Sequence, residues 1–208
     1  LLRYNASAKT VAVLAWCAGC FLKEHLRQKH IKYPHLFLIG EAGSGKSNTL
    51  ERVILPIFAR TKVNASTQVT SFTLMKESAS SNCIPQALDE FKPSKIDRLR
   101  LNALYNHMRD TYDGHAGLRG RADQTQVSYQ LLAPLVIAGE QSPDEADVIR
   151  SIHIHFDVQQ ISQRFIFQNE QSFDNDHVAG IDRFRCLGTC ILDEVIGRLL
   201  NRLAGDQL

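Results

Sequence analysis

The chain alternates between short, almost wholly apolar runs and longer stretches in which apolar residues recur every three or four positions. The apolar runs are HLFLIG at 35–40, CIPQALDEF at 83–91 and VSYQLLAPLVIAGE at 127–140, in which Pro134 marks a break before LVIAG. Runs of this kind are typical of buried strands in a parallel sheet. SIHIHFDV at 151–158 alternates well enough to predict a fourth strand.

The stretches between these runs carry the helical period. Helices are predicted at 7–30, 47–58 (with a break near Pro56), 71–81, 94–112 and 143–150, and residues 158–208 are predicted to be mostly helical. The first helix presents its apolar residues at Val11, Leu14, Ala15, Ala18, Phe21 and Leu22. Residues 61–70 and 112–125 are predicted loops. Strands that alternate with helices predict an α/β sandwich around a mainly parallel sheet.

A length of 208 residues suits one domain with a small appendage. We expect a core at 1–160 that includes the N-terminal helix, and a helical C-terminal extension or lid at 161–208. The chain does not begin with Met, and we expect it to be a segment of a larger protein with flanking domains. The longest apolar stretch, Val11 to Leu22, is shorter than the roughly 18 residues of a membrane span.

Composition narrows the class of protein only a little. The 24 basic and 22 acidic side chains give a net charge of +2, so any nucleic-acid contact must come from a local basic patch. Five cysteines, an odd number, indicate an intracellular, cytoplasmic protein without a disulfide framework. Cys17 with Cys20 and Cys186 with Cys190 could form a zinc site, but both pairs lie in apolar helical patterns, which favours core packing.

The first candidate for chemistry is the stretch FLIGEAGSGKSNTL at 37–50. It contains the pattern G-x-x-x-x-G-K-[ST], placed between a predicted strand and a predicted helix as a phosphate-binding loop requires. The backbone N–H groups of 43–47 would hold the β-phosphate, Lys46 would reach the β- and γ-phosphates, and Ser47 would ligate Mg²⁺. The predicted nucleotide-binding residues are Gly40, Gly43, Ser44, Gly45, Lys46, Ser47 and Asn48.

Asp89 and Glu90 end the second apolar run, 43 positions after Lys46. An Asp at this place can hold Mg²⁺, and the Glu beside it can act as the general base that activates water. Two carboxylates at a strand end also occur as surface residues, so the assignment depends on the loop. The pair favours hydrolysis over phosphoryl transfer to a second substrate.

Polar residues that follow the later strands are candidates for the terminal phosphate. Gln141 could orient the attacking water, whereas Glu140 is unusual beside a phosphate unless it contacts a cation; the alternative is a simple turn. Arg150 precedes the fourth strand, where it could act on a neighbouring subunit's γ-phosphate as an arginine finger, or could merely complement a helix end.

Two other features lie outside the predicted nucleotide site. Arg119 and Arg121 lie in the glycine-rich stretch 112–125, which is either a pore loop or hairpin that grips a nucleic-acid backbone or a solvated turn. His153 and His155 share one face of a predicted strand without a metal-spaced partner, which favours a structural role.

Together, LIGEAGSGKSNTL, CIPQALDEFKP, YDGHAGLRGRADQT, LLAPLVIAGE and DVIRSIHIHF resemble the ATPase core of helicase–primase proteins from phages and mobile elements. That family belongs to the additional-strand P-loop class, near AAA+ and superfamily 3 helicases. The resemblance implies a P-loop NTPase three-layer sandwich with a helical C-terminal segment, ATP and Mg²⁺ as cofactors, and a homo-oligomeric ring that acts on single-stranded or forked DNA. It also implies Asp89 on Mg²⁺, Glu90 as base and Arg150 as the finger. The family places Asn or Thr where this chain has Glu140 and Gln141.

The sequence therefore predicts an ATP-hydrolysing motor domain that unwinds or translocates on DNA during replication. Two alternatives stay open. A protein-remodelling or signalling ATPase would depend on an aromatic pore residue such as Tyr112, and a non-catalytic module would bind ATP only to order a subunit interface.

Overall fold

A computed structural model describes residues 7–120, 125–158 and 190 of the chain. The predicted extension at 161–208 lies outside the described residues apart from residue 190, and so does Arg121. Among the helices that are described, none is both long and apolar enough to cross a membrane.

The centre of the fold is a five-stranded sheet in which every pairing is parallel. It consists of β1 (His35–Gly40), β2 (Asn64–Ala65), β3 (Gln86–Phe91), β6 (Leu135–Gly139) and β7 (Ser151–Phe156), in the order β2-β3-β6-β1-β7. All five residues of β6 are buried, as are most of those in β1 and β3, which explains the apolar runs LVIAG and LFLI in the sequence. The class prediction, α/β with a mainly parallel sheet, is confirmed.

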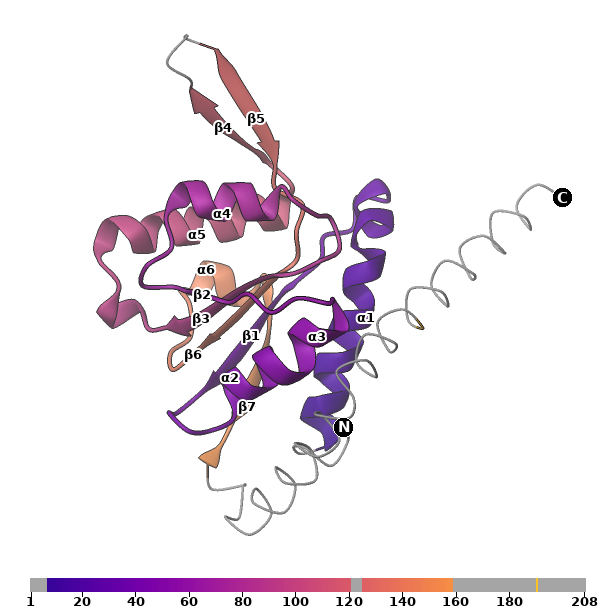
Figure 1. Cartoon of the computed structure of the whole chain (residues 1–208), viewed down its shortest axis with the longest axis vertical. Helices are drawn as coiled ribbons and strands as arrows, with labels where there is room; N and C mark the ends of the chain where they lie inside the picture. The colour runs from indigo at the N-terminus through magenta and orange to yellow at the C-terminus, as the bar shows by residue number, and fades with distance from the viewer. Residues whose placement is uncertain (1–6, 121–124, 159–189, 191–208) are drawn as a thin grey trace, which may run out of the picture.

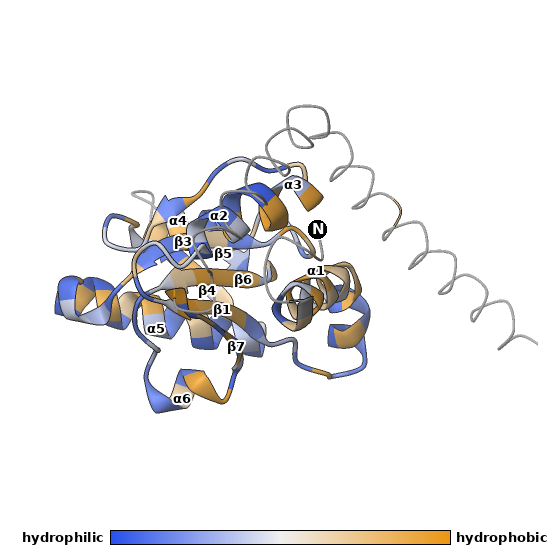
Figure 2. Ribbon diagram, turned by 90° about the horizontal axis from the view of Figure 1, so that it is seen from below, coloured by the Kyte–Doolittle hydropathy of each residue, from blue (hydrophilic) through white to orange (hydrophobic). Residues whose placement is uncertain are grey.

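Helices cover both faces of this sheet (Figure 1). One face packs against α1 (Ser7–Gln28) and a helical run made of α2 (Lys46–Thr49), a π-helical segment (Leu50–Ile54) and α3 (Leu55–Ile57). The other face packs against α4 (Ser71–Ser78) and α5 (Arg98–Asp113). A 3₁₀ turn (Pro93–Lys95) and α6 (Glu145–Val148) are the short elements. Figure 2 shows the apolar strands β1 and β6 between helices that carry both apolar and polar residues.

The buried face of α1 matches the predicted one only in part, since Leu14 and Phe21 of the predicted face pack half-buried against the core. The residues that face the sheet are Val13, Trp16, Cys17, Cys20 and Lys23, whereas Val11 is 52% exposed. Residues 11–22 are apolar almost all round, so their period does not select a face. Two hydrogen bonds connect the buried face of α1 to the rest of the protein. Trp16 Nε1 donates to the Pro34 carbonyl at 2.9 Å, and Lys23 Nζ donates to the Ala133 carbonyl at 2.9 Å. Cys17 and Cys20 lie in the core, as predicted.

Two local predictions were wrong. The helix after the glycine-rich loop does not break at Pro56 but continues to Ile57, with the π-helical segment just before the proline. A wider turn of this kind is a known way for a helix to absorb an irregularity. The segment 61–70, predicted as a loop, contributes the two-residue edge strand β2, which is too short to leave a period in the sequence.

Residues 116–130 form an antiparallel hairpin of β4 (Ala116–Gly120) and β5 (Gln126–Gln130) that projects from the body of the protein (Figure 1). The region before Pro134 is therefore a separate strand outside the central sheet. Gly117 faces α4 so closely that an added Cβ would lie 2.6 Å from Met75 Sδ. Of the two interpretations of this stretch, pore loop or hairpin against turn, the structure shows a hairpin.

Candidate functional site

The loop between β1 and α2, residues 40–47, is referred to here as the glycine loop. Gly43 and Gly45 adopt φ angles of 77° and 88°, a left-handed conformation that other residues adopt only at a cost. Gly45 stands at the N-cap of α2, so the N–H groups of the first helical turn point into the loop rather than into the helix. Such a turn presents backbone donors to an anion.

Lys46 lies across this loop and is only 7% exposed. Its Nζ donates to the Glu41 carbonyl at 2.6 Å and to Ser44 Oγ at 3.2 Å. Burial lowers the pKa of Lys46, while the negative charges of Asp89 and Glu140 act in the opposite direction. The ammonium group is thus held over the loop by weak neutral acceptors and lies in the field of two carboxylates.

The acidic pair lies near the end of β3, between the buried residues Leu88 and Phe91. Asp89 is half-buried and Glu90 is exposed. Glu90 has φ 58°, and the register between β3 and β6 shifts between Leu88 and Phe91, which marks a bulge at this point. Asp89 Oδ1 accepts the N–H of Glu90 at 2.7 Å. Bulges and strained residues of this kind re-aim side chains and are enriched next to functional sites.

This strain gives a test that separates stability from chemistry. Glu90→Gly is expected to raise the free energy of unfolding by about 1 kcal/mol, because glycine adopts positive φ without the steric cost that a Cβ brings. Glu90→Ala keeps the Cβ and serves as the matched control, with no such gain. Urea denaturation of the two variants measures the difference, and equal stabilities would contradict a strained Glu90.

Sheet topology brings the glycine loop and the acidic pair together. Strands β3, β6 and β1 are adjacent and parallel, so their carboxyl ends meet at one edge. A cleft of about 430 Å³ opens there, within the size range of small-ligand sites. Its lining includes Gly43, Lys46, Ser47, Asp89, Glu90 and Glu140. Five of the predicted nucleotide, metal and catalytic residues thus share one cleft with Glu140.

The remaining predicted residues of the loop have supporting positions. Gly40 ends β1 where an added Cβ would overlap with the carbonyl oxygen of Phe156, so β1 and β7 approach closely. Ser44 is fully buried below Lys46, and Asn48 is half-buried in α2. Gln141 is exposed and does not line the cleft; its Oε1 accepts the N–H of Ser94 at 3.4 Å.

Sequence reasoning missed two lysines in this cleft. Lys92 and Lys95 line it beside the acidic pair, and Lys92 forms an ion pair with Glu140. Glu140 was unusual beside a predicted phosphate site unless it contacts a cation, and Lys92 is that cation. The signal was present in the sequence, since both lysines follow Asp89 and Glu90 within DEFKPSK, but a strand end alone does not show which side chains turn inward.

Arg150 lies at the opposite edge of the sheet from the glycine loop. It immediately precedes β7, whose Ser151 pairs with His35 at the start of β1. Five to six residues of strand, roughly 17–20 Å, separate that edge from the cleft. Arg150 donates to the Ala146 carbonyl, and its guanidinium lies 5.8 Å from the ring centre of Tyr112.

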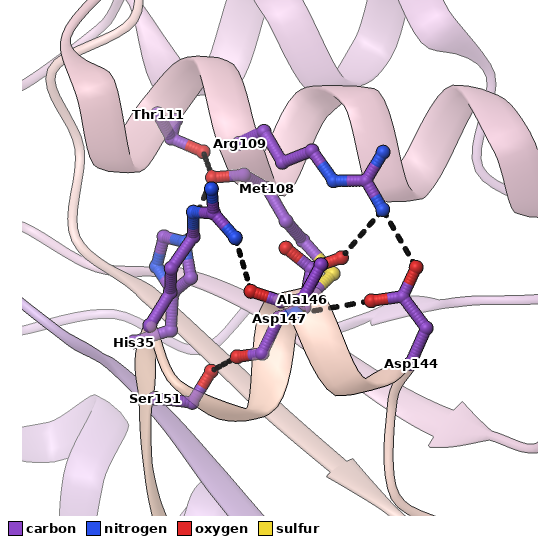
Figure 3. A network of polar contacts seen from close by, with 9 residues as sticks. His35, Met108, Arg109, Thr111, Asp144, Ala146, Asp147 and Ser151 are labelled. Carbon is purple, nitrogen blue, oxygen red and sulfur yellow. Dashed lines mark hydrogen bonds and ion pairs between the residues drawn. The ribbon is translucent and has the colours of Figure 1, made fainter.

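A polar network holds this edge together (Figure 3). Arg109 on α5 donates to Asp144 at 2.6 Å and to the buried Asp147 at 3.4 Å, which ties α5 to α6. Asp144 in turn caps α6 by accepting the N–H of Asp147 at 3.0 Å. The position of Arg150 at the end of α6 is thereby fixed, and it does not reach the cleft of its own subunit.

Two residues predicted to contact a polymer, Arg119 and Tyr112, make contacts with the body of the protein. The guanidinium of Arg119 stacks on Phe72 of α4, 3.7 Å from the ring centre. Tyr112 lies in the last turn of α5, on the body of the protein, with Lys32 5.2 Å above its ring, so it does not belong to the hairpin. Most of β4 is exposed, including Arg119, and Leu118 is 64% accessible.

The two histidines of β7 belong to the edge of the sheet. His153 packs 5.4 Å from the ring of Phe37, and His155 lies 6.3 Å from His153. Among the described residues, no cluster of three or more His, Cys, Asp or Glu side chains could hold a metal ion by itself. The Cys186 half of the zinc hypothesis lies outside the described residues.

Comparison with known proteins adds no family. No protein-family model matches the chain, and no curated protein matches it at a significant level. The cleft is therefore the basis on which a function can be proposed.

Proposed function

We propose that the chain is a P-loop ATPase domain that hydrolyses ATP in the cleft at the carboxyl edge of the sheet. The observation that carries this proposal is the convergence of Lys46 and Ser47 from the glycine loop with Asp89 and Glu90 from β3. The sheet order supports the additional-strand class, because β6 lies between the strand of the glycine loop and the strand of the acidic pair.

The residues present fit a Mg²⁺–nucleotide complex. The exposed Ser47 hydroxyl and the half-buried Asp89 carboxylate are oxygen ligands of the kind that Mg²⁺ takes in phosphate sites. When bound, Mg²⁺ neutralises charge on the phosphate oxygens. The loop N–H groups and Lys46 bind and orient the phosphate chain. Lys46 exchanges its present acceptors, the Glu41 carbonyl and Ser44, for phosphate oxygens.

Glu90 is the base in this proposal. It accepts a proton from a water molecule whose oxygen attacks the γ-phosphorus, while the bond to the leaving ADP oxygen breaks. Glu90 is exposed, has a left-handed backbone and lines the cleft, which supports this role. Arg150 completes the site of a neighbouring subunit in a ring, and Gln141 is a candidate to orient water there.

We propose DNA translocation as the use of this energy, through the hairpin of β4 and β5. Its projection from the body supports a nucleic-acid contact (Figure 1), as does the basic residue Arg121, which lies between the two strands in the sequence. ATP turnover should rise when single-stranded DNA is added, and the DNA concentration needed should increase steeply with salt, because phosphate contacts release counterions. Phosphate release measured across a DNA titration at two salt concentrations tests this prediction. Turnover that does not change with DNA at either salt concentration would contradict DNA translocation.

A second candidate, a protein-remodelling ATPase, is favoured by one observation. On the described part of the hairpin, Leu118 faces outward whereas Arg119 is engaged on Phe72. Stimulation of turnover by an unfolded polypeptide, but not by DNA, would identify this function instead.

A further inference from the structure

Three contacts join the ends of β3 and β6 beside the cleft. The N–H of Glu140 donates to the Phe91 carbonyl at 3.1 Å, and the N–H of Ser94 donates to Gln141 Oε1 at 3.4 Å. Between them lies the ion pair of Lys92 and Glu140. The backbones approach so closely here that a Cβ at Gly139 would overlap with the Phe91 carbonyl oxygen. The backbones that carry Lys92 and Glu140 are therefore held close together, and both residues line the cleft.

Charges in the cleft are balanced without a ligand. Lys46, Lys92 and Lys95 face three carboxylates, those of Asp89, Glu90 and Glu140. Lys92 holds the pKa of Glu140 below its usual value, with smaller effects of Lys46 and Lys95. Glu140 is thus ionised and interacts with all three lysines.

The pair is positioned to be exchanged. The side chains of Lys92 and Glu140 are 30% and 42% exposed, and ion pairs that solvent reaches contribute little to stability. A phosphate group carries more negative charge than a carboxylate and offers three oxygens to a lysine. An incoming polyphosphate therefore competes effectively with Glu140 for Lys92.

Position within the cleft indicates which phosphate is involved. The glycine loop and Lys46 stand on the β1 side, where they bind the β-phosphate in the proposed function. Lys92 stands two residues after Glu90, on the β3 and β6 side, where the attacked phosphorus must lie if Glu90 activates the water. The terminal phosphate is the one within reach of this side.

We propose that Lys92 is a second phosphate-binding lysine, which Glu140 holds in the nucleotide-free protein and which transfers to the γ-phosphate of a bound nucleoside triphosphate. This inference rests on the proposed function. It gives Glu140 a specific role, because the carboxylate holds Lys92 while the cleft is empty or contains a diphosphate. The cleft thereby distinguishes ATP from ADP.

The test compares the affinities of the whole chain for a slowly hydrolysed ATP analogue and for ADP, both with Mg²⁺, by titration calorimetry. Lys92→Gln should weaken binding of the triphosphate by about tenfold or more, the loss expected for a charged hydrogen bond, and that of ADP by less than about threefold. Glu140→Gln frees Lys92 and should tighten triphosphate binding by about two- to fivefold while leaving ADP unchanged. Lys76→Gln, an exposed position on α4, removes the same charge away from the cleft and should alter neither affinity.

The outcomes separate this inference from the proposed function. If the parent binds both nucleotides and Lys92→Gln leaves the ratio of the two affinities unchanged, the inference is wrong and the nucleotide site stands. If the parent binds neither, the proposed function and the inference fail together. Should Lys92→Gln not fold, Glu140→Gln carries the test, and an unchanged affinity ratio in that variant would overturn the inference.

Discussion

Glu90→Gln is expected to reduce ATP turnover by ~10²–10⁴-fold, the range for loss of a positioned general base. Glutamine keeps the size and hydrogen-bonding reach of glutamate but cannot accept the proton of the attacking water at neutral pH. Glu90 contributes neither to the glycine loop nor to the predicted Mg²⁺ ligands, so the affinity for MgATP should stay within about threefold of the parent value. Steady-state phosphate release and calorimetric titration measure the two quantities.

Glu51→Gln is the matched control for this experiment. Glu51 is exposed on the helical segment after the glycine loop and does not line the cleft, so its substitution removes the same charge from outside the site. The turnover of Glu51→Gln should equal that of the parent. A Glu90→Gln protein that retains turnover, or that loses ATP binding in proportion to turnover, would exclude Glu90 as the base.

Arg150→Ala is expected to lower turnover even further, by ~10³–10⁵-fold, if Arg150 is the finger of a neighbouring subunit. Arg150 lies at the amino edge of the sheet and cannot reach the cleft of its own chain, so any effect on hydrolysis must be exerted on a neighbouring subunit. Two inactive proteins, Arg150→Ala and Glu90→Gln, should therefore regain activity when mixed. In a random ring, about a quarter of the interfaces join an intact cleft to an intact Arg150.

Mixing also removes an ambiguity of the single variant. Arg150 contacts the Ala146 carbonyl and the Tyr112 ring, so Arg150→Ala could lose activity by disturbing α6. Recovery in the mixture requires that the Arg150→Ala subunit be folded and able to bind ATP. As a control, a mixture of Glu90→Gln with Lys46→Ala should stay inactive, because both changes fall in the same cleft. Absence of recovery in assembled mixtures would contradict a role for Arg150 in the cleft of a neighbouring subunit.

The central strands could be predicted from the sequence because buried parallel strands are apolar throughout. HLFLIG and LVIAG leave a signal that no polar face dilutes, and in QALDEF the polar pair Asp89 and Glu90 comes near the strand end. The elements that were missed carry little such signal. The two residues of β2 are too few for a period, and the strands of the hairpin, which the sequence left open against a turn, are mostly exposed, with glycines that resemble a loop. In α1, apolar residues lie almost all round the helix, so the sequence does not show which face is buried. The buried face is the one on which Trp16 and Lys23 form hydrogen bonds to backbone carbonyls.

Some residues of the candidate site were likewise predictable from the sequence and others were not. Lys46, Ser47, Asp89 and Glu90 were predictable because each lies next to a strand end that the topology brings to one edge. Lys92 and the left-handed backbone of Glu90 were not, because both depend on how β3 bulges against β6. The pairing of Glu140 with Lys92 likewise needs coordinates, since the two residues are 48 positions apart.

The most direct test of the central claim is the release of ADP and phosphate from ATP by the whole chain, with Mg²⁺ and with the metal chelated. It should be run at protein concentrations at which assembly is confirmed by light scattering. We predict equal amounts of ADP and phosphate, dependent on Mg²⁺, and loss of both in Lys46→Ala. An assembled, folded protein that releases neither product, or one whose activity is the same in Lys46→Ala, would contradict ATP hydrolysis in this cleft.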